Sequence, residues 1–254
     1  MLDRISVLLF SPAGGTRRAA MELAQALAYD TEIVDLCQPG LEGRTWQPEE
    51  AVLVAGPVYG GRLPSLMVER LAPFCGKDTL AVTAVVYGNR AFEDALLELN
   101  DCVKAQGFRV AASAALVAEH SMVPSVAHGR PDGQDLEQLH QFAGRILRKL
   151  EGEWAEPSVP GQRPYKEWSP MEAVPQVSRD CNRCGLCARQ CPNQAISAQD
   201  PGKTDASRCF LCMRCVHLCS HNARSLPQPV QAALQQKLGP LEQVRQGNQL
   251  FLGE

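Results

Sequence analysis

The most constraining feature of the sequence is a pair of cysteine motifs near its C-terminal end. Each motif has the form C-x2-C-x2-C-x3-C, and the second begins 28 residues after the first. Three thiolates on successive tight turns bind three irons of one [4Fe-4S] cubane, and the fourth cysteine of such a run ligates the neighbouring cluster. The spacing therefore predicts two [4Fe-4S] clusters, one held by Cys181, Cys184, Cys187 and Cys219 and the other by Cys209, Cys212, Cys215 and Cys191.

Two other uses of cysteine compete with this interpretation. Structural zinc sites usually separate their paired C-x2-C knuckles by a dozen or more residues, and disulfide scaffolds are typical of short secreted domains. Here 11 cysteines occur in 254 residues, and eight of them crowd into the two motifs. This pattern favours metal chemistry in a reducing compartment. Cys37, Cys75 and Cys102 are isolated, and we assign them no role because single thiols are usually small buried hydrophobes.

The composition indicates a globular chain of two domains. Hydrophobic residues make up 45% and charged residues 21%, with a formal net charge of -3. Such a nearly balanced charge does not favour nucleic acid or a membrane surface, so we expect partners among redox proteins, with a small-molecule substrate as a further possibility. The first apolar run, 5–10, is too short for a signal sequence or a membrane span. We expect it to be a buried strand of a cytoplasmic protein.

Residues 1–150 alternate between short apolar runs and longer amphipathic stretches. The runs at 5–10, 31–36, 51–56, 80–87 and 111–119 predict strands, and 17–29, 64–73, 91–106 and 135–150 predict helices. Strands joined through helices run parallel in a sheet covered on both faces. The pattern therefore predicts an α/β three-layer sandwich with a five-stranded parallel sheet.

The rest of the chain divides into three parts. A proline-rich linker is expected at 151–178, because five prolines there prevent a persistent helix. The cysteine-rich domain follows at 179–226, and 227–254 is a C-terminal extension with one helical stretch. The apolar residues Leu250, Phe251 and Leu252 at its end are expected to pack back on the first domain.

Three loops of the first domain have the composition of a ligand site. SPAGGT at 11–16 follows the first strand and precedes a helix, so backbone amides there can hold a phosphate. The loop lacks the G-x-G-x-x-G spacing of dinucleotide folds and the lysine of a Walker loop, which favours a small phosphomonoester over NAD or a nucleoside triphosphate. The loops at 56–64 and 86–90 end at the same edge of the sheet.

These two further loops favour a flat ring as the ligand. Gly60, Gly61 and Gly88 allow close backbone approach to a ring, and Tyr59 and Tyr87 could stack on it. Each tyrosine alone is more commonly a half-buried packing residue. The three loops together favour flavin.

The loop motifs S-P-x-G-x-T, P-V-Y-x-G-R and Y-G-N-R, followed by tandem cluster motifs, resemble those of the flavodoxin-ferredoxin fusion family, the ferrodoxins. The resemblance implies a flavodoxin-like domain of strand order 2-1-3-4-5 that binds FMN, fused to a small α+β 2[4Fe-4S] ferredoxin-like domain. The candidate FMN-binding residues are Ser11, Ala13, Gly14, Gly15, Thr16, Pro57, Val58, Tyr59, Gly60, Gly61, Arg62, Tyr87, Gly88, Asn89, Arg90 and His120.

The sequence departs from this pattern at three positions. Ala13 and Gly15 stand where flavodoxins commonly have a second hydroxyl residue and Asn, which removes side-chain hydrogen bonds to the phosphate. Ser220 replaces the proline that follows the first motif as Pro192, which removes no ligand.

Three polar residues of the loops are candidates for adjusting the flavin. Arg62 and Arg90 could stabilise the anionic reduced ring near its N1-C2=O edge, although a surface ion pair is an equally good interpretation of each. His120, in the segment after the fifth strand, could donate a proton, although a structural histidine is the more common case.

We expect an electron-transfer protein that passes low-potential electrons between FMN and two clusters. The alternative is an FMN-dependent reductase that acts on an organic or corrinoid substrate, and a third, a sensory module with structural clusters, fits tandem cubanes less well. The sequence names neither the donor nor the acceptor, nor the oligomeric state.

Overall fold

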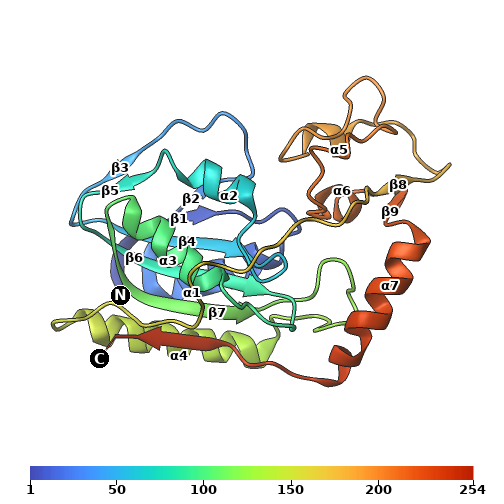
Figure 1. Cartoon of the computed structure of the whole chain (residues 1–254). Helices are drawn as coiled ribbons and strands as arrows, with labels where there is room; N and C mark the ends of the chain where they lie inside the picture. The colour runs from blue at the N-terminus through green and yellow to red at the C-terminus, as the bar shows by residue number, and fades with distance from the viewer. Residues whose placement is uncertain (254) are drawn as a thin grey trace.

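A six-stranded sheet forms the centre of the first domain in the computed structural model, which describes residues 1–253 (Figure 1). Its strands are β1 (Leu2–Leu9), β2 (Ala28–Asp35), β4 (Ala51–Pro57), β6 (Thr79–Tyr87), β7 (Phe108–Val117) and β10 (Gln249–Leu252). Their order is β10-β7-β6-β4-β1-β2, and the five N-terminal strands pair in parallel. These five strands have the flavodoxin-like order 2-1-3-4-5.

The sixth strand corrects the expectation of a five-stranded sheet. β10, at the end of the chain, pairs antiparallel with β7, so the C-terminal extension packs back on the first domain as expected. Its side chains alternate between the two sides of the sheet: Phe251 packs with one apolar cluster, and Leu250 and Leu252 pack with the other. A four-residue strand whose partner lies more than 100 residues away leaves little local signal in the sequence.

Helices cover both faces of the sheet. On one face lie α1 (Gly15–Leu27) and α4 (Gly133–Leu150), which contact each other. On the other lie α2 (Ser65–Leu71) and α3 (Ala95–Ala105). The central strands are buried on both sides, as their continuous apolar sequence predicts. Two short strands, β3 (Thr45–Trp46) and β5 (Cys75–Gly76), form a separate pair.

The linker runs along α3 toward the cysteine-rich domain. Tyr165 donates its hydroxyl hydrogen to Asp101 of α3, and the guanidinium of Arg163 pairs with the same carboxylate. The cysteine-rich domain contains α5 (Leu186–Arg189) and α6 (Arg214–His217) beside a two-stranded sheet. That sheet pairs β8 (Gln176–Val177) with β9 (Arg224–Ser225). None of the helices in residues 1–253 is long and apolar enough to cross a membrane.

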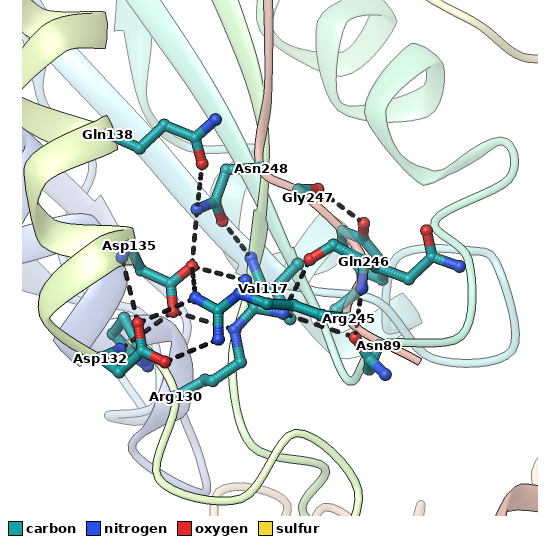
Figure 2. A network of polar contacts seen from close by, with 12 residues as sticks. Asn89, Val117, Arg130, Asp132, Asp135, Gln138, Arg245, Gln246, Gly247 and Asn248 are labelled. Atoms are coloured by element: carbon teal, nitrogen blue, oxygen red, sulfur yellow. Dashed lines mark hydrogen bonds and ion pairs between the residues drawn. The ribbon is translucent and has the colours of Figure 1, made fainter. Parts of the chain in front are cut away.

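The chain then returns to the first domain through α7 (Gln228–Leu238) and the short helix η1 (Gly239–Gln243). A buried polar network fastens the segment that follows (Figure 2). Arg130 and Asp135 form an ion pair with side chains 4% and 2% exposed, and Asn248 donates to the same carboxylate at 3.0 Å. Arg245 pairs with Asp132, the N-cap of α4. This network joins the C-terminal segment to the loop that precedes α4.

Candidate cofactor sites

The eight motif cysteines surround two separate cavities. One, of about 420 Å³ including its open mouth, is lined by Cys181, Cys184, Cys187 and Cys219. The other, of about 370 Å³, is lined by Cys191, Cys209, Cys212 and Cys215. Each cavity therefore combines three thiols of one motif with the fourth thiol of the other. These are the two sets that the spacing predicts, and below we call them the first and second cysteine cavities. In residues 1–253, no three Cys, His, Asp or Glu side chains converge on a position for a single metal ion.

Local backbone structure places the thiols in the same way in both halves. Each motif turns through a left-handed residue, Gly185 with φ 74° or Met213 with φ 64°, into a one-turn helix that carries its third cysteine. The fourth cysteine of each motif then accepts a backbone hydrogen bond, from Ala195 to Cys191 and from Ala223 to Cys219, at 3.2 and 3.3 Å. Such N–H···S bonds stabilise thiolates and lower the energy of a bound anionic cluster.

A larger cavity, of about 1850 Å³ including its open mouth, lies at the carboxyl edge of the sheet, beyond the ends of β1, β4, β6 and β7. We call it the sheet-edge cavity. Its floor consists of the three predicted loops and residues 118–122, and its roof comes from the linker, the second cysteine motif and α7. Of the predicted FMN-binding residues, it is lined by Ala13, Gly14, Gly15, Thr16, Pro57, Val58, Tyr59, Gly60, Tyr87, Gly88, Arg90 and His120.

The first loop has the backbone geometry of an anion site. Gly14 is the N-cap of α1 with φ 92°, in open space where a β-carbon would meet nothing, and no acidic residue occupies the first turn. The amides of that turn have no helical partners and carry the positive end of the helix dipole. Ser11 does not line the cavity. Its hydroxyl instead accepts a hydrogen bond from the Arg17 amide at 2.8 Å, which joins the start of the loop to the first turn of α1.

Arg62 lies outside the sheet-edge cavity, which corrects its expected position beside a flavin. Its guanidinium donates to both carboxylate oxygens of Glu98, at 2.7 and 2.8 Å, and stacks 4.8 Å from the ring centre of Tyr165. Arg62 therefore joins the second loop to α3 and the linker.

Asn89 is also turned away from this cavity. It is almost fully buried, and its side-chain amide donates to the carbonyls of Leu241 and Val244 while its oxygen accepts from the Gln246 amide. Asn89 thus holds the C-terminal segment, as the close-up shows for Gln246 (Figure 2).

The loop glycines make room for this chain's own side chains, and two of them, Gly60 and Gly88, also line the sheet-edge cavity. A β-carbon on Gly60 would overlap the Trp168 ring, and one on Gly61 would overlap the Glu93 carboxylate. A β-carbon on Gly88 would overlap His120. Gly60 and Gly88 therefore shape the walls of the site, whereas Gly61 lies outside it.

The two tyrosines differ in their freedom to contact a ligand. Tyr87 is 4% exposed, with its ring 5.6 Å from that of Phe92 and its hydroxyl bonded to the Gly247 carbonyl, so it is mainly a packing residue. Tyr59 is half-buried, and its ring lies 6.4 Å from Trp168 and 6.1 Å from Phe210. Tyr59 is the better candidate for contact with a bound ring.

His120 is held as a neutral imidazole. Burial, and secondarily the positive charge of Arg90, lowers the pKa of His120 to about 4. Its Nδ1 accepts hydrogen bonds from the amides of Met122 and Val123 at 3.3 and 3.2 Å, which places the ring proton on Nε2. At neutral pH His120 can therefore donate a hydrogen bond into the cavity but has no imidazolium proton to give. Arg90 itself pairs with Glu93 at 2.7 Å.

Sequence reasoning missed the residues that roof the sheet-edge cavity. Trp168 comes from the linker, Phe210 from between two cluster ligands, and Lys237 from α7. Arg17 and Arg130 also line the cavity. Arg17 had a local signal, because it follows the phosphate-type loop directly. The others had none, because only the folded chain brings them to the sheet edge.

Comparison with known proteins identifies the cysteine-rich part of the chain. The family model of a 4Fe-4S dicluster domain matches residues 180–223. A search of curated proteins finds no match. The chain is a flavodoxin-like domain joined to a ferredoxin-type domain.

Solved structures similar to the chain include two flavodoxins and an oxidoreductase. A flavodoxin from Streptococcus pneumoniae is 18% identical, covering 57% of this chain and 99% of that one, with a TM-score of 0.39. A flavodoxin from Fusobacterium nucleatum, solved with flavin mononucleotide, is 13% identical over 58% and 99%, with a TM-score of 0.40. Rubredoxin oxygen:oxidoreductase from Desulfovibrio gigas is 14% identical with a TM-score of 0.40, and the similarity covers 59% of this chain but only 37% of that protein.

Proposed function

We propose that the chain is an electron-transfer protein that binds FMN in the sheet-edge cavity and one [4Fe-4S] cluster in each cysteine cavity. When bound, FMN exchanges one or two electrons and each cluster exchanges one. The observation that supports this most strongly is that the sheet-edge cavity and the second cysteine cavity share two lining residues, Phe210 and Leu211. A single wall therefore separates the two proposed sites.

The residues of the sheet-edge cavity suit a mononucleotide. The first turn of α1 offers one anion site, and Arg17 and Arg18 add positive charge beside it. Arg18 also donates to the Pro131 carbonyl at 3.1 Å, which keeps its guanidinium at the rim. The apolar and aromatic residues of the other loops suit a flat ring.

The wall between the sites consists of apolar side chains. The Phe210 ring lies 6.1 Å from Tyr59 and 6.3 Å from Phe10, centre to centre. Phe10 is fully buried. Side chains packed in this way hold the two cavities at a fixed separation, which favours exchange inside one chain over exchange by collision.

The decisive experiment is anaerobic reconstitution of the full chain with iron, sulfide and FMN. We expect about eight irons and eight sulfides per chain and one FMN, because eight thiols form two complete sets. Addition of a one-electron reductant should then decrease the flavin absorbance and the cluster absorbance together. Protein loaded with FMN alone is the control. Zinc, about four irons, or a flavin that never equilibrates with the clusters would contradict the proposal.

The roof of the cavity supports a second candidate, an FMN-dependent reductase of an organic or corrinoid substrate. Trp168, Met171, Leu234 and Leu238 extend the cavity beyond the three loops with apolar side chains. Such a roof leaves room for a small molecule and hinders a protein partner. Saturable oxidation of the reduced protein by a small acceptor would favour this enzyme. Exchange only with carrier proteins would favour the electron carrier, whose donor and acceptor we propose to be redox proteins.

A further inference from the structure

The cysteine cavities are lined by three arginines that form no ion pair within residues 1–253: the exposed Arg208 and the less exposed Arg214 and Arg224. Arg224 is only 4% exposed and lines the first cysteine cavity. Arg214 lines the second, and its Nε is buried without a hydrogen-bond partner. In residues 1–253 neither arginine forms an ion pair with Asp or Glu within 4.0 Å.

Arg224 contacts both halves of the domain. Its guanidinium donates to the Pro201 carbonyl, and Nη1 lies 3.4 Å from the Thr204 hydroxyl. The same Nη1 lies 4.0 Å from Sγ of Cys215, a thiol of the second set. Arg224 therefore lines the first cysteine cavity while it contacts a ligand of the second.

Arg214 lines only the second cysteine cavity. One terminal nitrogen donates to the side-chain oxygen of Gln190 at 2.9 Å, the residue before the crossing ligand Cys191. Arg214 is half-buried, and the neutral amide of Gln190 does not neutralise its charge.

Moving a cation from water into the protein interior costs free energy, and only a charged or strongly polar partner compensates for that cost. A cubane with four thiolates is an anion, and its own charge is the largest in such a site. We propose that Arg224 is a buried counter-cation for both clusters and that Arg214 is a half-buried one for the second cluster alone, so that each sets the reduction potential of the clusters it faces. This inference rests on the proposed presence of two clusters.

The internal repeat shows that these arginines are not required simply to line a cavity. Aligning the two motifs places Ile196 opposite Arg224 and Leu186 opposite Arg214. Ile196 lines the second cysteine cavity and Leu186 lines the first. Each half of the domain thus shows which apolar residue can occupy the corresponding position beside a cluster.

A cation near a cluster favours the reduced state, because each cluster gains one electron without making or breaking a bond and becomes more negative. Arg224→Ile should therefore lower the potentials of both clusters. Arg214→Leu should lower only one, that of the second cysteine set. Arg183→Leu is the matched control, because Arg183 lies between two ligands of the first set but is exposed. Its counterpart in the repeat is Leu211, which gives the choice of leucine. Water and salt screen the charge of an exposed arginine. Arg183→Leu should shift either potential less than Arg224→Ile does.

The measurement is an EPR-monitored redox titration of the anaerobically reconstituted full chain, with iron and sulfide determined for each variant. Arg224→Lys keeps the charge and should retain potentials close to those of the original protein. If Arg224→Ile keeps both clusters at unchanged potentials, or if Arg224→Lys shifts them as much, the inference is wrong and Arg224 acts by packing.

Loss of clusters in a variant is also informative. If Arg224→Ile loses iron and Arg224→Lys retains it, the positive charge is needed to hold the clusters, as proposed. Loss of iron from both variants would overturn the inference. Failure of the unsubstituted chain to bind two clusters would instead overturn the proposed function, so the two failures are distinguishable.

Discussion

Replacing Asp135 by Asn tests whether the buried network in Figure 2 fastens the C-terminal segment. The Asp135 carboxylate accepts from the Arg130 guanidinium at 2.5 and 2.9 Å and from the Asn248 amide at 3.0 Å. The neutral amide introduced at position 135 would leave the buried Arg130 guanidinium without an anionic partner. This should lower the free energy of unfolding by about 3–5 kcal/mol. The matched control is Asp101→Asn, because Asp101 pairs with Arg163, whose side chain is 57% exposed. This substitution should lower the free energy of unfolding by only about 0–1 kcal/mol.

The assay is urea unfolding of the reconstituted protein at pH 7, with hydrogen exchange measured on peptides from 245–252. Asp135→Asn should lower the unfolding midpoint and raise exchange in this segment. Burial is the largest single effect and opposes ionisation of Asp135. The hydrogen bonds from Arg130, Asp132 and Asn248 and the positive charge of Arg130 together outweigh it, so the pKa of Asp135 is lowered in the folded protein. Its stabilisation is therefore present above the unfolded pKa of about 3.9 and is lost as the pH falls through the lower folded value. Equal effects of the two variants, or a difference that persists undiminished in acid, would refute this reasoning.

Three further predictions concern the cofactor sites. Cys191→Ala should impair the cluster of the second cysteine cavity and Cys219→Ala that of the first, and EPR of each reduced variant should show the other cluster surviving. Gly15→Val should weaken FMN binding by about one to two powers of ten in fluorescence titrations. A side chain there meets the Ala118 β-carbon at 3.2 Å and displaces the first turn, and loss of one hydrogen bond to a charged phosphate costs about 1.5–3 kcal/mol. Riboflavin, which has no phosphate, should lose less affinity. Arg90→Ala should lower the reduction potential of bound FMN, measured by spectroelectrochemistry, because Arg90 lines the sheet-edge cavity. Arg62→Ala should leave this potential unchanged, because Arg62 pairs with Glu98 outside the cavity. Identical shifts in the two variants would show that position at the cavity does not determine the effect.

Sequence spacing alone was enough to predict the grouping of the eight thiols. The cysteine motifs are local, and tight turns at fixed spacing leave few arrangements, so both sets of four could be assigned before the fold was known. The alternation of apolar and amphipathic segments likewise predicted the parallel sheet and its helices, because periodicity and strand connection are properties of neighbouring residues. The first loop and the helix that follows it could be predicted for the same reason, because their residues are neighbours in the sequence.

The tertiary structure decided the rest, because side-chain direction and long-range pairing depend on contacts between distant segments. Arg62 and Asn89 occupy loops at the correct edge of the sheet, yet they bind Glu98 and the C-terminal segment in place of lining the cavity. The strand β10 and the roof residue Trp168 likewise reach the sheet edge from remote parts of the chain. A loop motif specifies where the backbone turns, but the burial of charge and the packing of aromatic rings determine which side chains face a ligand.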